Sequence, residues 1–163
     1  MTSENRPVMI CSNHLTLVDS VIQALIFNSC FGYLRHPKTL AWNFPERKNF
    51  YHKFTWRIFC YFGKCIPVTR GGSPQQNKTA RDQMQYVSKR GDVLAIFPEG
   101  RRSRTGRVDT TDFSYAPGLF LQELSQPKVL CVYMRGRKYG GFADFPTKND
   151  EIYIDLSLIE PKS

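Results

Sequence analysis

One histidine and one aspartate near the start of the chain have the residue types and order of a general-base pair. His14 and Asp19 are five positions apart. Histidine is the side chain that most often takes a proton near neutral pH, and a carboxylate behind it fixes its tautomer and stabilises the imidazolium. Five residues at about 100° each set two side chains roughly 140° apart on a regular helix. The pairing therefore requires His14 in a turn and Asp19 at the cap or in the first turn of the helix that follows.

The same two residues also fit a purely structural interpretation. Aspartate at a helix start offsets the unpaired N–H groups and the helix dipole, which would leave His14 without a role. Taken alone, the pair favours this structural interpretation over catalysis.

Two further polar clusters have the chemistry of an anion site. Arg70 precedes Gly71, and arginine binds phosphate bidentately while glycine lets the backbone approach an anion closely. Glu99 precedes Gly100 and Arg101, so a carboxylate able to bond a substrate hydroxyl stands beside an N–H group able to face a phosphate. A surface arginine before a glycine turn and a solvated basic loop are the alternatives for the two clusters.

The elements that must position these residues alternate between strand and helix. Strands are expected at 7–11, 38–42, 65–68, 93–97, 129–134 and 152–158, and helices at 19–31, 50–62, 75–90 and 118–125. This alternation predicts a single α/β domain over 1–163, with a largely parallel central sheet flanked by helices. Each polar cluster follows a predicted strand, and ligand sites of such sheets lie at the carboxyl ends of strands. The three clusters are therefore expected at one edge of the sheet.

Composition narrows the partners. The formal net charge is +9, from 23 Lys and Arg against 14 Asp and Glu, which favours nucleic acid, acidic lipid or a phosphorylated substrate. The five cysteines form no C-x-x-C pair, so a disulfide framework is not expected and a reduced, cytosol-facing compartment fits better. The three histidines show no spacing that pairs them with cysteines as a zinc site.

Several protein classes are disfavoured by missing motifs. The chain has no G-x-S-x-G elbow, no phosphate loop and no dinucleotide fingerprint. It also shows no helix-turn-helix pattern, RNP signature or zinc finger, so a nucleic-acid partner is not expected. No run of about 18 apolar residues occurs, and residues 1–6 lack the apolar core of a signal peptide. Any contact with a membrane is thus expected from the side.

Three motifs taken together resemble a known family. NHLTLVD at 13–19, GKCIPVTRG at 63–71 and FPEGRRSR at 97–104 occur in the order and rough spacing found in the glycerolipid acyltransferases. The pattern is similar to that of the 1-acylglycerol-3-phosphate acyltransferases, with the glycerol-3-phosphate acyltransferases and tafazzin as relatives. The resemblance extends over about residues 7–134.

The resemblance implies a reaction and a set of site residues. His14 would remove a proton from the acceptor hydroxyl that attacks an acyl thioester, and Asp19 would orient His14. The co-substrate would be acyl-CoA or acyl-carrier protein, with no metal and no bound cofactor. Substrate-binding residues carried over from the motifs are Arg70, Gly71, Glu99, Gly100 and Arg101.

The chain departs from the family pattern in three places. Arg101 stands where the third motif usually carries threonine. The fourth block, expected as an apolar strand with a proline, is VLCVYM at 129–134 without one. The N-terminal helices with which many members contact the membrane are missing ahead of Pro7. These departures leave the acceptor open.

The implied partners are a lysophospholipid and an anionic membrane surface, and the implied location is peripheral, on the cytoplasmic face of a membrane. The aromatic segment 50–62, with Lys53 and Arg57, is a candidate interfacial element. The alternative is a core helix packed on the sheet, with Trp56 or Tyr61 at the interface. A tafazzin-like transacylase that needs no CoA and a non-catalytic lipid-binding module stay open as functions, as do chain length, donor and oligomeric state.

Overall fold

The computed structural model describes residues 6–108, 113–138 and 143–161, and its centre is a four-stranded sheet. The strands are β1 (Val8–Ser12), β2 (Val93–Ile96), β3 (Lys128–Gly136) and β4 (Ile152–Ile159), in the order β2-β1-β3-β4. β1 runs parallel to both β2 and β3, and β4 is antiparallel to β3. The predicted α/β fold with a largely parallel sheet is confirmed.

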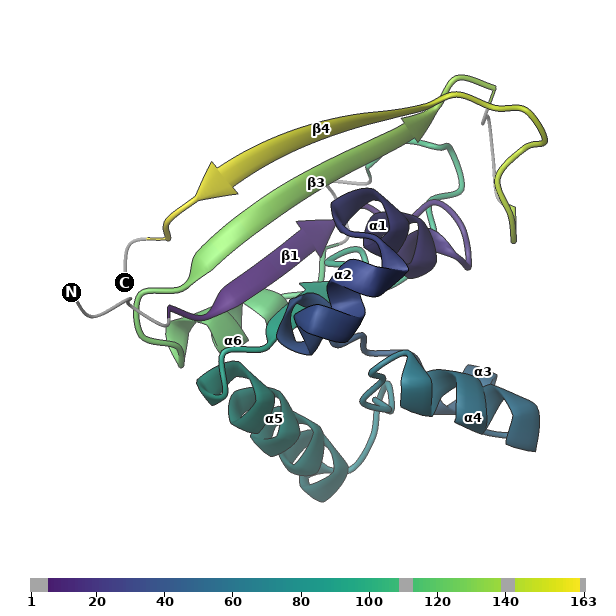
Figure 1. Cartoon of the computed structure of the whole chain (residues 1–163). Helices are drawn as coiled ribbons and strands as arrows, with labels where there is room; N and C mark the ends of the chain where they lie inside the picture. The colour runs from purple at the N-terminus through teal and green to yellow at the C-terminus, as the bar shows by residue number, and fades with distance from the viewer. Residues whose placement is uncertain (1–5, 109–112, 139–142, 162–163) are drawn as a thin grey trace.

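Helices fill the connections between the strands. They are α1 (Asp19–Phe27), α2 (Cys30–Arg35), the short 3-10 helix η1 (Pro37–Thr39), α3 (Arg47–Phe50), α4 (Phe54–Phe62), α5 (Pro74–Lys89) and α6 (Ala116–Gln122). Figure 1 shows α1 and α2 in front of β1, α5 and α6 below the sheet, and α3 with α4 projecting away from it.

Alternate residues of β1 divide the core into two layers, because neighbouring side chains of a strand point to opposite faces. Met9 packs with Val87 of α5 and Phe120 of α6. Ile10 belongs to the other layer, with Leu15 of the β1–α1 connection and Ile22 of α1. A strand covered on both faces is expected to be apolar, as β1 is from Val8 to Cys11.

Two helices predicted as continuous are each broken in two. The helix expected over 19–31 ends at Phe27, because Asn28 is extended and Ser29 caps α2 by accepting a hydrogen bond from the Gly32 N–H. The helix expected over 50–62 begins only at Phe54, as α4, because Lys53 is extended; Phe50 is the last residue of the separate short helix α3. Apolar residues stand on both sides of each interruption, which favoured a continuous helix in each case.

Two predicted strands were wrong. The segment expected at 38–42 begins as η1, which starts at Pro37, and then contributes one isolated parallel bridge between Trp42 and Leu94. The segment at 65–68 forms isolated parallel bridges to residues 43 and 46 rather than a continuous strand. Trp42 bridges β2, and the segment at 65–68 runs parallel to the residues that follow Trp42. The chain after 68 therefore reaches the same edge of the sheet as the chain after β1 and β2.

The helices are short. Within the three described ranges, none has the length and apolar character required to cross a bilayer.

Candidate active site

His14 lies in a turn that is anchored to the neighbouring strand. β1 ends at Ser12, and the side chain of Asn13 then makes two hydrogen bonds to β3. Asn13 Nδ2 donates to the Met134 carbonyl at 2.8 Å, and the Met134 N–H donates to Asn13 Oδ1 at 2.7 Å. These two hydrogen bonds fix the point at which the chain leaves the sheet, and hence the position of His14.

His14 and Asp19 are paired as the sequence predicts. His14 Nδ1 lies 2.8 Å from Asp19 Oδ2, and Asp19 is the first residue of α1. The Asp19 side chain is 1% exposed, and it also accepts from the N–H groups of Leu15 (2.5 Å) and Thr16 (2.9 and 3.0 Å) and from Thr16 Oγ1 (2.6 Å). The turn before α1 folds around Asp19, the first residue of that helix. It thereby brings His14 and Asp19 together, although a straight helix would separate them.

The hydrogen bonds of Asp19 decide which nitrogen of His14 carries the proton. Both Asp19 oxygens accept hydrogen bonds from other groups, so the proton between the pair is assigned to His14 Nδ1. A neutral imidazole protonated on Nδ1 has an unprotonated Nε2 that can accept a proton. This is the tautomer that a general base requires.

The imidazole is also held from a second side. Its ring stacks on Phe97 with centroids 4.3 Å apart and planes 23° apart. The Ser103 N–H donates to the His14 carbonyl at 2.6 Å. The His14 side chain keeps 22% of its surface exposed, so the ring is fixed in orientation and still reachable by a ligand.

Glu99 lies directly against the His14 turn. It is buried, and its Oε1 accepts from the His14 backbone N–H at 3.1 Å. Gly100 has φ +61° and donates its N–H to the Phe97 carbonyl at 2.9 Å, closing a tight turn after β2. An added Cβ would meet no atom within 4 Å at Gly100, so glycine is needed there for its left-handed backbone and not for space.

Arg70 reaches the same edge of the sheet but is bound to a different carboxylate. Its N–H donates to Glu46 Oε2 at 3.1 Å, and its Nε lies 3.6 Å from the same oxygen. The Glu46 side chain is 10% exposed, while that of Arg70 is 66% exposed. Gly71 follows with φ +62°, a left-handed conformation that glycine adopts readily. The Arg70 turn is thus fixed at its backbone and open at its guanidinium.

The spacing of the strands gives the separation between Arg70 and His14. The segment at 65–68 lies beside that at 42–46, which lies beside β2, which pairs with β1. Three strand spacings amount to about 14 Å. The structure therefore brings Asp19 into contact with the His14 ring and Glu99 into contact with the His14 backbone, and sets Arg70 across the edge from them.

The basic loop after Gly100 is tied back to the body of the molecule. Arg101 is exposed, whereas Arg102 pairs with Asp144 and donates to the Ala143 carbonyl at 3.0 Å. Buried Ser103 holds the loop from inside, since its Oγ donates to the Arg107 carbonyl at 2.6 Å. Of the two arginines, Arg101 presents the larger surface to solvent.

A cavity of about 230 Å³ adjoins Glu99 on the side of the sheet that faces α5 and α6. Its lining is predominantly apolar and comes from β1, β3 and the loop after β2: Cys11, Ser12, Asn13, Pro98, Glu99, Val108, Phe113, Cys131, Val132 and Tyr133. Burial, with a smaller contribution from the neighbouring Cys131, raises the pKa of the Cys11 thiol to about 11. Cys11 is consequently neutral at pH 7 and contributes an uncharged wall.

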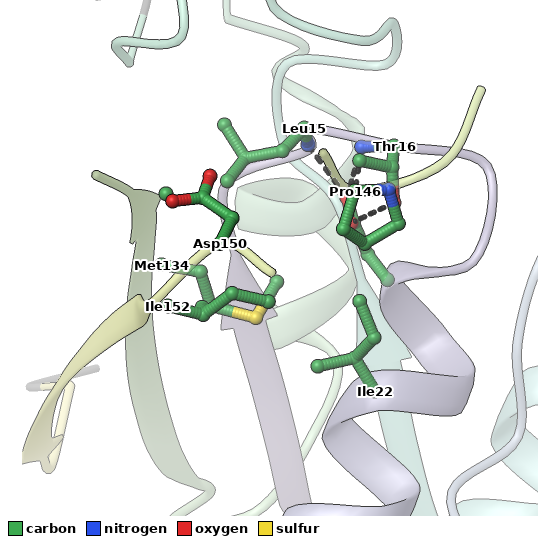
Figure 2. Close-up of a pocket in the computed structure, with 9 residues that line it drawn as sticks. Leu15, Thr16, Ile22, Met134, Pro146, Asp150 and Ile152 are labelled. Carbon is green, nitrogen blue, oxygen red and sulfur yellow. Dashed lines mark hydrogen bonds between the residues drawn. The ribbon is translucent and has the colours of Figure 1, made fainter. Parts of the chain in front are cut away.

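A second, much smaller pocket lies between α1 and the β3–β4 pair, with Asp19 in its wall. Figure 2 shows Leu15, Ile22, Met134 and Ile152 around it, together with Pro146 and Asp150 from the segment that precedes β4. Its volume of about 20 Å³ is enough for roughly one water molecule. A pocket of that size is suited to a solvent molecule and not to a substrate.

Some residues of this site were missed in the sequence. Thr16 and Phe97 contact the two sides of the His14–Asp19 pair, and Glu46 holds the Arg70 turn. Thr16 lies three residues before Asp19, a spacing typical of helix caps, and could have been found from that spacing. Glu46 and Phe97 depend on the tertiary fold. Among the described residues, no group of three His, Cys, Asp or Glu side chains converges as a metal site.

Comparison with known families agrees with this arrangement. A family model described as Acyltransferase matches residues 1–134, a range that contains His14, Asp19, Arg70 and Glu99. The chain therefore belongs to the acyltransferase family. No curated protein matches the chain significantly.

Proposed function

We propose that the protein transfers a fatty acyl chain from acyl-CoA or acyl-carrier protein to a lysophospholipid, with 1-acylglycerol-3-phosphate as the acceptor. The observation that carries the proposal is the 2.8 Å contact between His14 Nδ1 and Asp19 Oδ2, at an aspartate whose remaining hydrogen bonds all come from its own turn. Among the described residues, no serine, threonine or cysteine side chain hydrogen-bonds the His14 ring, whose partner is Asp19. An oriented base of this kind suits direct transfer between two substrates.

The proposed reaction has one proton acceptor and no covalent acyl-enzyme. The acceptor hydroxyl donates to His14 Nε2, and its oxygen attacks the thioester carbonyl carbon as the proton moves to the imidazole. Asp19 stabilises the resulting imidazolium. The tetrahedral intermediate then collapses, the C–S bond breaks, and the departing thiolate takes the proton from His14. Atoms and charge balance, and the base returns to its starting state.

The acceptor phosphate is assigned to the basic groups across the edge of the sheet. The separation of about 14 Å between the His14 and Arg70 positions suits an extended arginine side chain and a glycerol phosphate placed end to end. Gly71 and Gly100 supply the left-handed turns that bring the two loops to this edge. Arg101 adds an exposed cation, and Glu99 stands beside the reacting hydroxyl through its contact with the His14 turn.

The cavity beside Glu99 is assigned to the distal part of an acyl chain. Its apolar wall and neutral Cys11 suit methylene groups. Asn13 and Glu99 belong both to its lining and to the two turns around His14. A chain entering there would keep its carboxyl end near the imidazole.

The experiment is product analysis by mass spectrometry with a panel of lysophospholipids. Each acceptor is incubated with acyl-CoA, with acyl-carrier protein loaded with the same chain, or with an intact phospholipid as the only acyl source. A diacyl product that requires a thioester donor and is formed fastest from 1-acylglycerol-3-phosphate is the expected result. Product from the phospholipid donor alone would identify a transacylase, and no product from any pair would leave a non-catalytic lipid-binding module.

The substrates are lipids, so the proposed place of action is the surface of a membrane. We place the protein on the cytoplasmic face, as its free thiols and net positive charge suggest. The segment 50–62 is the candidate for contact with the bilayer, and the exposed side chains around it define the contact surface more closely.

A further inference from the structure

Helix α4 turns its apolar stripe outward. Phe54, Ile58, Tyr61 and Phe62 are spaced at i, i+4, i+7 and i+8, the pattern by which an amphipathic helix covers a core. All four are exposed, with Tyr61 at 80% and Phe62 at 75%, while Cys60 is the single buried residue of the helix. Figure 1 shows the reason, because α3 and α4 project from the body and lie against no strand.

Helices α1 and α2 add a second exposed apolar surface. The large apolar side chains exposed there are Val21, Leu25, Ile26, Phe27, Phe31 and Leu34. The two helices are held together by the Tyr33 hydroxyl, which donates to the Ala24 carbonyl at 2.7 Å. Phe31 and Leu34 are three residues apart on α2 and therefore lie on one side of it.

A hydrogen bond links the segments that follow α2 and α4. Lys64 Nζ donates to the Pro37 carbonyl at 2.6 Å. Leu34 lies three residues before Pro37, and Phe62 lies two residues before Lys64. The exposed apolar side chains of α1, α2 and α4 are called here the apolar collar. They belong to the α1–α2 pair and to α4, which this hydrogen bond connects. An exposed apolar surface of this extent marks a partner or a membrane.

Charge decides between those two occupants. Residues 20–64 contain a single acidic residue, Glu46, whose side chain is 10% exposed and faces Arg70. The same stretch contains seven basic residues: Arg35, Lys38, Arg47, Lys48, Lys53, Arg57 and Lys64. Lys53 and Arg57 flank Phe54 on α4, and Arg35 follows Leu34 on α2. Aromatic and aliphatic side chains bordered by cations, with almost no exposed anion among them, match the layered chemistry of a bilayer interface with acidic headgroups.

We propose that the apolar collar docks on the surface of an anionic bilayer, with α2 and α4 lying in the headgroup region and the cations at their ends contacting lipid phosphates. The inference goes beyond the reaction proposed above and does not depend on it, since it concerns a surface that excludes His14 and Arg70. It extends the docking element from the segment 50–62 to α1 and α2, and it assigns the collar to lipid and not to a second copy of the chain.

The test is flotation of the purified full chain with lipid vesicles. One vesicle preparation is phosphatidylcholine alone and the other contains three parts phosphatidylcholine to one part phosphatidylglycerol. The wild type is expected to float with the anionic vesicles at least tenfold better than with the neutral ones. The double variant Phe31→Ser/Phe62→Ser is expected to lose at least tenfold in partitioning. The double variant Lys53→Glu/Arg57→Glu is expected to lose as much, on anionic vesicles only.

Control variants outside the collar separate an effect of the collar from the effect of any surface substitution. Leu119 and Leu158 are each 61% exposed and lie on α6 and β4, outside the collar, so Leu119→Ser/Leu158→Ser is expected to float like the wild type. Lys89→Glu/Lys148→Glu is the control for charge reversal. The variants change exposed side chains, so circular dichroism is expected to match the wild type. Should a collar variant misfold, Phe62→Trp reports on the same surface by a blue-shifted, lipid-quenched emission when vesicles are added.

Two results would overturn the proposal. One is a wild type that floats with neither vesicle, or a Lys53→Glu/Arg57→Glu variant that floats with the anionic vesicles as well as the wild type does. The other is a wild type that is dimeric in solution and becomes monomeric in Phe31→Ser/Phe62→Ser, which would assign the collar to a second copy. His14→Ala separates this outcome from the proposed reaction, because that variant is expected to float normally whether or not the chemistry is as described.

Discussion

Residues 12–19 and residues 54–62 are segments of similar length with inverted surroundings. In the first, Ser12, Asn13, Thr16 and Asp19 are polar and buried. In the second, helix α4 is apolar and almost wholly exposed, with Cys60 as its one buried residue. Polar groups are ordinarily buried only with hydrogen-bond partners, and large apolar patches are ordinarily covered.

The two segments differ in how their surroundings accommodate them. The buried polar groups have hydrogen-bond partners within the fold, because Asp19 accepts from the N–H groups of its own turn and Asn13 bonds to Met134 of β3. The apolar side chains of α4 are left uncovered by the rest of the described chain. The polar segment is thus held by bonds within the fold, whereas the collar offers apolar surface to a partner outside it, which we propose is a bilayer.

The largest effect is expected from breaking the buried segment at Asp19. Asp19→Asn keeps the shape of the side chain, but its amide NH₂ must face either the N–H groups of the turn or the His14 ring. An NH₂ that faces the ring favours the imidazole tautomer protonated on Nε2, which cannot act as the base. We expect turnover to fall by about a thousandfold or more and the free energy of unfolding to fall by about 1–3 kcal/mol. Steady-state kinetics and urea titration measure the two quantities.

Asp82→Asn is the control for that substitution, because Asp82 is exposed on α5 and pairs with Lys78. It should change neither quantity appreciably. An Asp19→Asn variant with wild-type turnover would show that the carboxylate serves only as the cap of α1.

A smaller effect is expected in the cavity beside Glu99. Cys131→Phe places a larger side chain in its wall and should shift donor preference toward shorter acyl chains. Each methylene that no longer fits costs roughly tenfold in kcat/KM. Competition between donors of different length, read by mass spectrometry, measures the shift. Unchanged preference would place the chain elsewhere.

The Arg70 turn offers a still smaller effect. Glu46→Gln removes the charge that holds Arg70 while keeping a hydrogen-bond acceptor, so we expect KM for a phosphate-bearing acceptor to rise severalfold with kcat nearly unchanged. The matched control is Glu160→Gln, which alters an exposed glutamate paired with Arg6. A fall in kcat with no change in KM would contradict a role for this turn in acceptor binding.

The smallest effect on stability is expected in the collar. Phe62→Ser should leave the free energy of unfolding within about 0.5 kcal/mol of the wild type, whereas Met134→Ala in the core should cost about 2–5 kcal/mol. Thermal or urea unfolding checks both. A large loss from Phe62→Ser would mean that Phe62 packs against the body of the protein.

The sequence predicted the parts of this molecule that local pattern controls. The apolar runs of β1, β2 and β3 were recognisable because a buried parallel strand has no polar face. The His14–Asp19 pairing was predicted as a turn followed by a helix cap, and the structure has that geometry. Glu99 was expected beside the same edge, and it lies against the His14 turn.

The rest depended on tertiary structure or on single polar residues. The break between α1 and α2 falls at Asn28, and α4 begins only after Lys53. Apolar residues on both sides of these positions favoured continuous helices. The segments at 38–42 and 65–68 have strand-like composition, yet Pro37 and Pro67 limit their pairing to isolated bridges. Glu46 is distant from Arg70 in sequence, and its contact exists only because those two segments run side by side.

General-base catalysis by His14 is tested by the turnover of His14→Ala with a thioester donor and 1-acylglycerol-3-phosphate. The control is His52→Ala, which changes an exposed histidine of the α3–α4 turn. We expect a loss of at least about a hundredfold for His14→Ala, no loss for His52→Ala, and unchanged vesicle flotation for both. Equal turnover of His14→Ala and the wild type would contradict it.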